Sequence, residues 1–270
     1  MNMQRVKTII IKDWKEIGKS KQAVLPMIIV PLIFVVALPV IITLIASTSS
    51  LSIVTSGGPE TFLKNFPAQL IPQEFNERQK TVYAILLYFF TPFFLFIPVM
   101  VSNIIASYSF AGEKEQKTIE GLLYTPVTDN ELIFSKILTS FIPGVVISWV
   151  CFIIYGIIVN FLGFPMFHRI IFPNLNWLVL AFFLVPAISF LSLASVVMVS
   201  QKAASAWEAQ QVAVLLILPI LGLVISQAAG LIYLNASVSS LVGIIFLLID
   251  ILFFRRIVRN FNRERVITKV

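Results

Sequence analysis

The chain has 270 residues, of which 58% are hydrophobic and only 12% are charged. Soluble domains carry about 45–50% apolar and about 25% charged residues, so the 20 basic and 13 acidic residues here are too few to cover a water-soluble surface. The single cysteine, Cys151, cannot form an internal disulfide. The composition therefore excludes a soluble enzyme, a disordered chain and a secreted disulfide module, and predicts an all-α polytopic membrane protein.

Residues 1–22 are predicted to form an amphipathic helix that lies in the membrane interface. Val6, Ile10, Trp14 and Ile17 recur at three- and four-residue spacing, whereas basic residues occupy the other faces. The alternative is a merely positive tail, which the regular apolar spacing and the tryptophan disfavour.

Residues 23–270 are predicted to form a six-span transmembrane domain, because six apolar stretches approach the roughly 20 residues that a membrane-crossing helix needs. The stretches cover residues 23–46, 83–108, 137–162, 177–200, 212–234 and 238–254. Three prolines interrupt the first stretch, and the last one is the shortest. Only residues 235–237 separate the fifth stretch from the sixth, so a re-entrant hairpin is an alternative for that pair.

The basic residues predict the orientation of the spans. With six spans both termini lie on one side, and that side carries sixteen of the lysines and arginines, against four on the other. The positive-inside rule therefore places both termini in the cytoplasm, with residues 47–82 as a long outer loop. This asymmetry and anionic lipid headgroups account for the net charge of +7, so no nucleic acid partner is expected.

Several kinds of chemistry lack their residues in this chain. Gly18-Lys19-Ser20 looks like the end of a phosphate-binding loop, but Asp13 stands where that motif needs a glycine. His168 is the only histidine, so a histidine-rich metal site cannot be built, and its predicted place in an outer loop beside Arg169 disfavours a Ser–His nucleophile. We therefore predict no catalytic residue, no metal ligand and no cofactor in the chain itself.

Few polar residues lie within the predicted spans. Asp250 is the one acidic residue there, and an interfacial ion pair with Arg255 or Arg256 is favoured over a functional charge. Asn103 and Gln227 are more typical of hydrogen bonds between helices than of a reaction site.

The one long polar segment on the predicted cytoplasmic side falls into two parts. Residues 112–126 combine acidic positions with apolar ones, which indicates a short amphipathic helix that Pro126 ends. Thr128 followed by Glu131 is a capping box that can start the third span. On these grounds alone the short helix is either a docking element or a solvated connector.

This segment resembles the signature of the permeases of type 2 ABC exporters. The matching residues are Gly112, Glu113, Glu115, Thr118, Glu120, Leu122, Leu123, Pro126 and Lys136. Ile119 stands where the family often has leucine. A second match begins at Gln201 and Lys202 and continues through residues 209–211 into the fifth span. With the six-span plan, the resemblance covers the whole chain.

The resemblance implies that this chain is the permease subunit of an ATP-driven exporter in a prokaryotic plasma membrane. Residues 112–126 would be a coupling helix against a cytoplasmic ABC ATPase, Gln201 and Lys202 a second contact, and Lys136 a charge partner of Glu120. Two ATPase copies would bind ATP and Mg, and a second permease, identical or related, would complete the pathway. Asn103 and Gln227 are then candidates to line that pathway.

An ion-coupled secondary carrier is the alternative from another class of protein. Such a carrier usually holds its coupling ions near the middle of the membrane, often at broken helices. The proline-rich first span is in keeping with that, but Asp250 alone near the cytoplasmic end disfavours it. The sequence leaves the substrate open.

Overall fold

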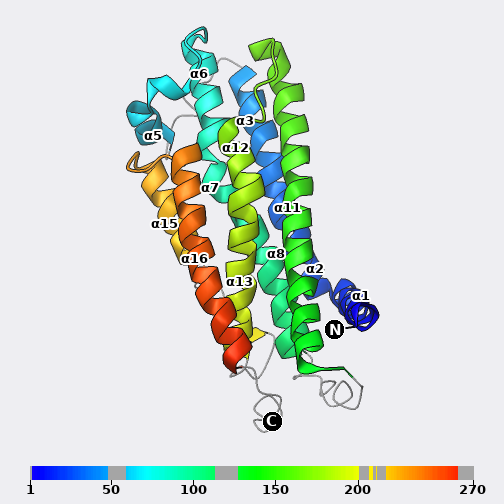
Figure 1. Cartoon of the computed structure of the whole chain (residues 1–270). Helices are drawn as coiled ribbons and strands as arrows, with labels where there is room; N and C mark the ends of the chain where they lie inside the picture. Colours follow the sequence, from blue (N-terminus) through cyan, green and yellow to red (C-terminus); the bar gives the residue numbers. More distant parts are fainter. Residues whose placement is uncertain are drawn as a thin grey trace.

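The computed structural model describes residues 2–47, 59–112, 127–200, 207–208, 211 and 217–260. Within these residues the regular structure is helical, and the helices form an elongated bundle (Figure 1). Five helices among them are long and apolar enough to cross a membrane: Lys21–Ala46, Glu77–Phe110, Glu131–Phe167, Leu175–Val199 and Ala236–Ile257. The predicted all-helical membrane class is confirmed at that level.

Helix α1 covers Met3–Lys19 and lies at the lower end of the bundle, across the direction of the spans (Figure 1). Ser20 separates it from the first span, since Ser20 ends α1 and its side chain accepts the Ala23 N–H that opens the next helix. The predicted N-terminal helix is therefore present, and its place in a membrane interface stays a prediction.

The first span consists of α2 (Lys21–Pro31), a π-helical segment η1 (Leu32–Ala37) and α3 (Leu38–Ser47). Proline has no N–H and crowds the preceding turn, so a helix that carries it must adjust its hydrogen bonds locally. Pro31 and Pro39 flank η1, which is the adjustment seen here.

The second span starts earlier than its apolar stretch because Asn76 and Gln79 form a capping box ahead of it. It runs through α6 (Glu77–Ala84), η3 (Ile85–Phe89), α7 (Thr91–Phe94), α8 (Phe96–Ser107) and η4 (Tyr108–Gly112). This is the most deeply buried of the five candidate spans, since the other helices surround it.

The third span lies in α11 (Asp129–Phe167), which has 39 residues. At about 1.5 Å per residue such a helix is longer than the roughly 30 Å hydrocarbon core, so it extends beyond the apolar stretch. The capping box predicted at its start is confirmed. The Thr128 side chain accepts the Glu131 N–H at 3.4 Å, and the Glu131 carboxylate accepts the Thr128 N–H at 3.1 Å.

The fourth span comprises α12 (Leu175–Val179), η5 (Leu180–Leu184) and α13 (Val185–Ser200), with Asn174 as its N-cap. The loop before it is held by Asn160 of α11. The Asn160 amide oxygen accepts the N–H groups of Ile171 and Phe172 at 3.0 Å, and its nitrogen donates to the Phe172 carbonyl. The side chain thus fixes the turn between the third and fourth spans.

The region of the fifth predicted span differs from the other five. Its described helix, α15 (Ile217–Ala228), has 12 residues, too few to cross a bilayer, while residues 212–216 lie outside the described part. Gly230 at φ 71° ends it in the left-handed conformation that favours glycine, with the Leu231 N–H bonded to the Ser226 carbonyl. A sixth crossing therefore stays a prediction.

Helix α16 (Ala236–Asn260) contains the last span and brings the chain back to the end of the bundle where α1 lies (Figure 1). At the opposite end, α5 (Pro59–Asn65) and the short η2 (Ala68–Leu70) cover the bundle. Phe62 of α5 is fully buried, and its ring centroid lies 5.3 Å from that of Phe89 and 5.7 Å from that of Tyr233. The described part of the predicted outer loop thus packs onto the helices.

The second span is interrupted at Phe90, between η3 and α7, and three other parts of the chain stabilise this break. Pro92 supplies no N–H, so the Tyr88 carbonyl four residues earlier lacks its usual helical donor, and three carbonyls of η3 receive side-chain donors from other helices. The donors are Tyr155 Oη to the Leu86 carbonyl at 2.6 Å, Trp177 Nε1 to the Leu87 carbonyl at 2.8 Å, and Gln227 Nε2 to the Tyr88 carbonyl. These side chains come from α11, α12 and α15, so the break is fixed by the tertiary fold.

Candidate functional site

Most residues that the resemblance assigns to ATPase coupling lie outside the described part of the chain. These are Glu113, Glu115, Thr118, Glu120, Leu122, Leu123, Pro126, Gln201 and Lys202. The exception is Lys136, in the second turn of α11. The segments that flank residues 113–126 are both described, namely η4 on one side and the start of α11 on the other.

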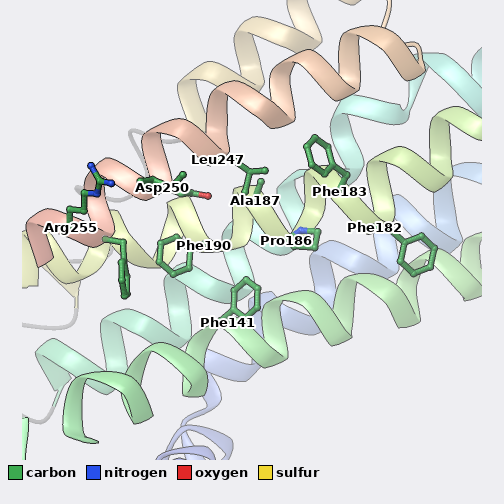
Figure 2. A pocket seen from close by; sticks show the side chains of 11 residues that line it. Phe141, Phe182, Phe183, Pro186, Ala187, Phe190, Leu247, Asp250 and Arg255 are labelled. Atoms are coloured by element: carbon green, nitrogen blue, oxygen red, sulfur yellow. The ribbon is translucent and has the colours of Figure 1, made fainter. Parts of the chain in front are cut away.

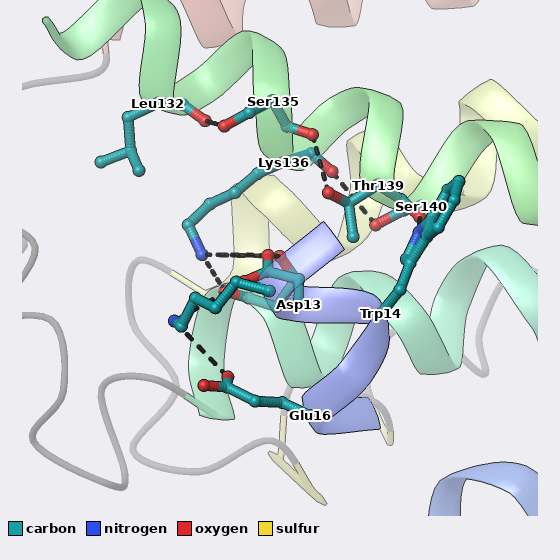
Figure 3. Close-up of polar contacts among 10 residues, drawn as sticks. Asp13, Trp14, Glu16, Leu132, Ser135, Lys136, Thr139 and Ser140 are labelled. Carbon is teal, nitrogen blue, oxygen red and sulfur yellow. Dashed lines mark hydrogen bonds and ion pairs between the residues drawn. The ribbon is translucent and has the colours of Figure 1, made fainter. Parts of the chain in front are cut away.

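Lys136 lies in a buried polar cluster that joins these two flanks to α1 (Figure 3). Its ammonium donates to the backbone carbonyl of Ser109 and lies 3.4 Å from the Ser109 hydroxyl. The ammonium also lies 3.9 Å from a carboxylate oxygen of Asp13, and the Ser109 hydroxyl donates to that same oxygen at 2.6 Å. We call Asp13, Ser109 and Lys136 the junction cluster.

Burial makes the junction cluster energetically important. The side chains of Asp13 and Lys136 are 2% and 4% exposed, and charges so far from water are tolerated only when they are paired and hydrogen-bonded. Lys12 adds a second cation 3.7 Å from the other Asp13 oxygen, and the Phe110 ring lies 5.4 Å from the Lys136 ammonium. The cluster is therefore a fixed point between three segments distant in sequence.

Further contacts attach α1 to the first turns of α11. The Asn2 N–H donates to the Glu131 carboxylate at 2.5 Å, and Arg5 lies 3.9 Å from the same group. Farther along, Trp14 Nε1 donates to the Thr139 carbonyl at 2.9 Å. The N-terminal helix is thus bound to α11 along its length, and a shift of either helix displaces the other.

A small cavity of about 110 Å³ opens beside the junction cluster. It is lined by Asp13, Glu16, Ile17, Ser20, Tyr108, Ser109 and Gly112. Gly112 is the residue at which the predicted coupling segment begins, so the cavity adjoins that segment's entrance.

The sequence analysis missed Asp13 as a member of this site. The face of α1 that is buried consists of Val6, Ile9, Asp13 and Ile17, one residue away from the predicted stripe at two positions. An acidic residue in an otherwise apolar helical stripe requires a buried cation, and the position of Asp13 between Ile9 and Ile17 could have been recognised from the sequence. The described carboxylate next to Lys136 is Asp13, whereas Glu120, its expected partner, lies outside the described residues.

The two pathway candidates are both buried within the chain. Asn103 in α8 accepts a hydrogen bond from the Ser107 hydroxyl at 3.2 Å. Gln227 donates to the Tyr88 carbonyl and accepts the Leu234 N–H at 3.1 Å, so both ends of its amide bind the backbone. Their role in a pathway stays a prediction. Among the described residues, no three His, Cys, Asp or Glu side chains gather as metal ligands would.

Comparison with known proteins supplies the family. Residues 7–258 match the family described as ABC-2 family transporter protein. Neither the search of curated proteins nor the search of solved structures gave a match. The matched region contains most of α1, the junction cluster and all five candidate spans. The chain therefore belongs to the ABC-2 transporter family, as the membrane-spanning permease of an ABC exporter whose ATPase is a partner protein.

Proposed function

We propose that this permease receives the motion of its ATPase through residues 112–126 and transmits it by the junction cluster. Glu113, Glu115, Thr118, Glu120, Leu122, Leu123 and Pro126 would form the coupling helix, with Gln201 and Lys202 as a second contact. Two ATPase copies would bind ATP and Mg. Membership of the ABC-2 transporter family supports the export function, and it does not support the alternative of an ion-coupled secondary carrier.

The observation that carries this proposal is the position of the junction cluster. Ser109 lies shortly before the coupling segment and Lys136 shortly after it, and both contact each other and Asp13. Because the two flanks are attached to one another and to α1, a push on the segment moves α8, α11 and α1 together. Helix α8 of the second span packs closely against α11, so the displacement reaches the membrane interior.

The test is the charge reversal Glu120→Lys in the assembled transporter. We expect loss of the ATPase on co-purification and loss of transport, because repulsion replaces an attraction at a desolvated contact, which costs on the order of several kcal/mol. The matched control is Glu60→Lys on α5, where an exposed carboxylate at the other end of the bundle pairs only with Lys64 among the described residues. Normal assembly and transport in Glu120→Lys would show that residues 112–126 are a solvated connector.

The complete transporter would contain two copies of this permease or this permease and a related one. The support is the exposed face of α15, where Leu218, Leu221 and Ile225 are 59%, 39% and 66% exposed. Gly222 lies on the same face, and a Cβ there would meet no atom within 4 Å. Small and apolar residues together allow close helix packing in lipid.

Cysteine cross-linking tests this contact in a background carrying Cys151→Ser. Gly222→Cys should give a cross-linked permease pair because α15 would lie at the seam. Ile157→Cys is the control, since this residue is 63% exposed on α11, on the far side of the bundle from α15 (Figure 1). Equal cross-linking at both positions, or none at residue 222, would rule out an α15 seam.

The chain is a multi-pass membrane protein by its family and its helices. We place it in the plasma membrane of a prokaryote, with α1 and the end of α16 on the cytoplasmic side. The basic residues of these segments support that orientation.

A further inference from the structure

The membrane-embedded part of the chain contains one carboxylate without a partner. Asp250 lies in the last span, is 5% exposed, and neither of its carboxylate oxygens receives a hydrogen bond from the described residues. The ion pair expected with Arg255 or Arg256 is wrong, since no salt bridge joins them. Arg255 lies five residues further along α16, and its guanidinium points away from the Asp250 carboxylate (Figure 2).

Asp250 lines a cavity of about 610 Å³ between α16, α13, η5 and α11 (Figure 2). The walls are apolar and largely aromatic, and the lining residues include Phe141, Phe182, Phe183, Phe190 and Phe254 as well as Asp250 and Arg255. The cavity is within the roughly 300–1,000 Å³ range of sites for small organic molecules. Its shape and lining therefore suit a ligand with a substantial apolar body.

The charge of the cavity decides the ligand's polar group. A carboxylate removed from water is stable only with a compensating positive charge or hydrogen-bond donor. Arg255 also lines the cavity, but its side chain is exposed and points away from Asp250, and no described residue donates a hydrogen bond to the carboxylate. Aromatic rings attract cations to their faces, which adds to the attraction of the carboxylate. An anionic ligand would place its charge against the unpaired Asp250 carboxylate, with only the exposed Arg255 to offset it, and a purely apolar ligand would leave Asp250 unpaired.

An inorganic cation does not fit this lining. Hard metal ions such as Mg²⁺ and Ca²⁺ require about six or more oxygen ligands, and the lining side chains offer one carboxylate, Asp250, together with Arg255 and hydrocarbon. Organic cations need only one counter-ion when their remaining surface is apolar.

We propose that this cavity is a binding site for amphipathic organic monocations, with Asp250 as counter-ion and the phenylalanines around the apolar body. This proposal depends on the export function proposed above only for the purpose of the site. The organic cations would then be compounds that the permease takes from the membrane. Binding itself requires no ATPase.

The experiment measures equilibrium binding of tetraphenylphosphonium to the full chain in phosphatidylcholine nanodiscs, with empty nanodiscs subtracted. Tetraphenylborate, which has nearly the same size and the opposite charge, is the matched probe. We expect saturable binding of the cation with at least a tenfold preference over the anion. Asp250→Asn should weaken cation binding by about tenfold or more, which corresponds to about 1.4 kcal/mol.

Three variants separate the site from general effects on the protein. Asp250→Glu keeps the charge and should retain binding. Phe190→Leu removes one aromatic ring from the lining and should weaken binding of the cation more than binding of the anion. Glu77→Gln removes an exposed charge at the start of α6 and should change nothing. If Asp250→Asn does not fold, the preference of the wild-type chain for the cation and the result for Phe190→Leu still test whether the cavity binds organic cations.

The proposal is overturned if both ions bind equally, or if folded Asp250→Asn binds the cation as the wild type does. Nanodiscs that contain phosphatidylethanolamine test a second source of ammonium. Loss of tetraphenylphosphonium binding there would assign the cavity to a lipid headgroup, against this proposal. Because no ATPase is present, failure of ATP-driven export would leave these results unchanged, and the two ideas fail separately.

Discussion

Replacing Lys136 with methionine should destabilise the chain by about 3–5 kcal/mol, because it leaves the Asp13 carboxylate buried without the ammonium of α11. Methionine has a similar length and no charge, so the change removes the ion pair with little change in volume. The thermal unfolding midpoint should fall on the order of 10 °C. Cys151 is the only cysteine and is buried in α11, so a thiol-reactive fluorogenic dye reports unfolding.

The double variant Asp13→Asn/Lys136→Met removes both charges and should recover most of the lost stability. An exposed ion pair provides the contrast: Lys64→Met breaks the pair with Glu60, whose side chains are 70% and 58% exposed, and should cost at most about 1 kcal/mol. A double variant no more stable than Lys136→Met would mean that Lys136 acts through other contacts. In the complex, the double variant also tests transmission, since a stable chain with reduced ATP-driven transport would separate coupling from folding.

Replacing Trp177 with alanine should cost about 3–5 kcal/mol in the same unfolding assay. Trp177 is fully buried, stacks on Tyr155 with ring centroids 4.8 Å apart, and donates to the Leu87 carbonyl. The alanine variant loses both the packing and the donor at the break in the second span. Trp207→Ala is the matched control, since Trp207 is 67% exposed and its loss should change stability by about 0.5 kcal/mol or less.

Two milder variants divide the effect of Trp177 into its parts. Trp177→Phe keeps a ring but removes the donor, and the Leu87 carbonyl still accepts from Thr91 Oγ1 at 3.0 Å, so the loss should be small. Tyr155→Phe leaves the Leu86 carbonyl without its side-chain donor and should cost about 1–3 kcal/mol. If Trp177→Ala is as mild as Trp207→Ala, the aromatic packing around the break contributes nothing to stability.

Local signals predicted the features of this fold that depend on neighbouring residues. The apolar stretches located the five long helices, since a helix that crosses the bilayer needs roughly 20 apolar residues. The capping box at Thr128 and Glu131 was equally readable because donor and acceptor lie three residues apart. The α1 stripe was predicted less accurately, because its partly exposed Trp14 is apolar and its buried Asp13 is charged.

Features that depend on distant contacts were not readable. Nothing near Asp13 in sequence points to Lys136, and nothing near Asp250 shows that Arg255 turns away from it. The helix α15 ends at Ala228, before the end of its apolar stretch at residue 234, because Gly230 adopts a left-handed conformation. In each case the deciding partner or backbone angle is set by the tertiary fold.

The three donors at the break in the second span constrain how the protein is made. Tyr155, Trp177 and Gln227 all follow the second span in the chain, so during synthesis η3 enters the bilayer before these three donors exist, and Thr91 of the same span donates its hydroxyl only to the Leu87 carbonyl. A bare carbonyl in hydrocarbon costs on the order of several kcal/mol, which disfavours release of this span into lipid by itself. The second span is therefore best retained beside the insertion machinery until the third, fourth and fifth segments arrive, so that biogenesis proceeds by joint release of helices.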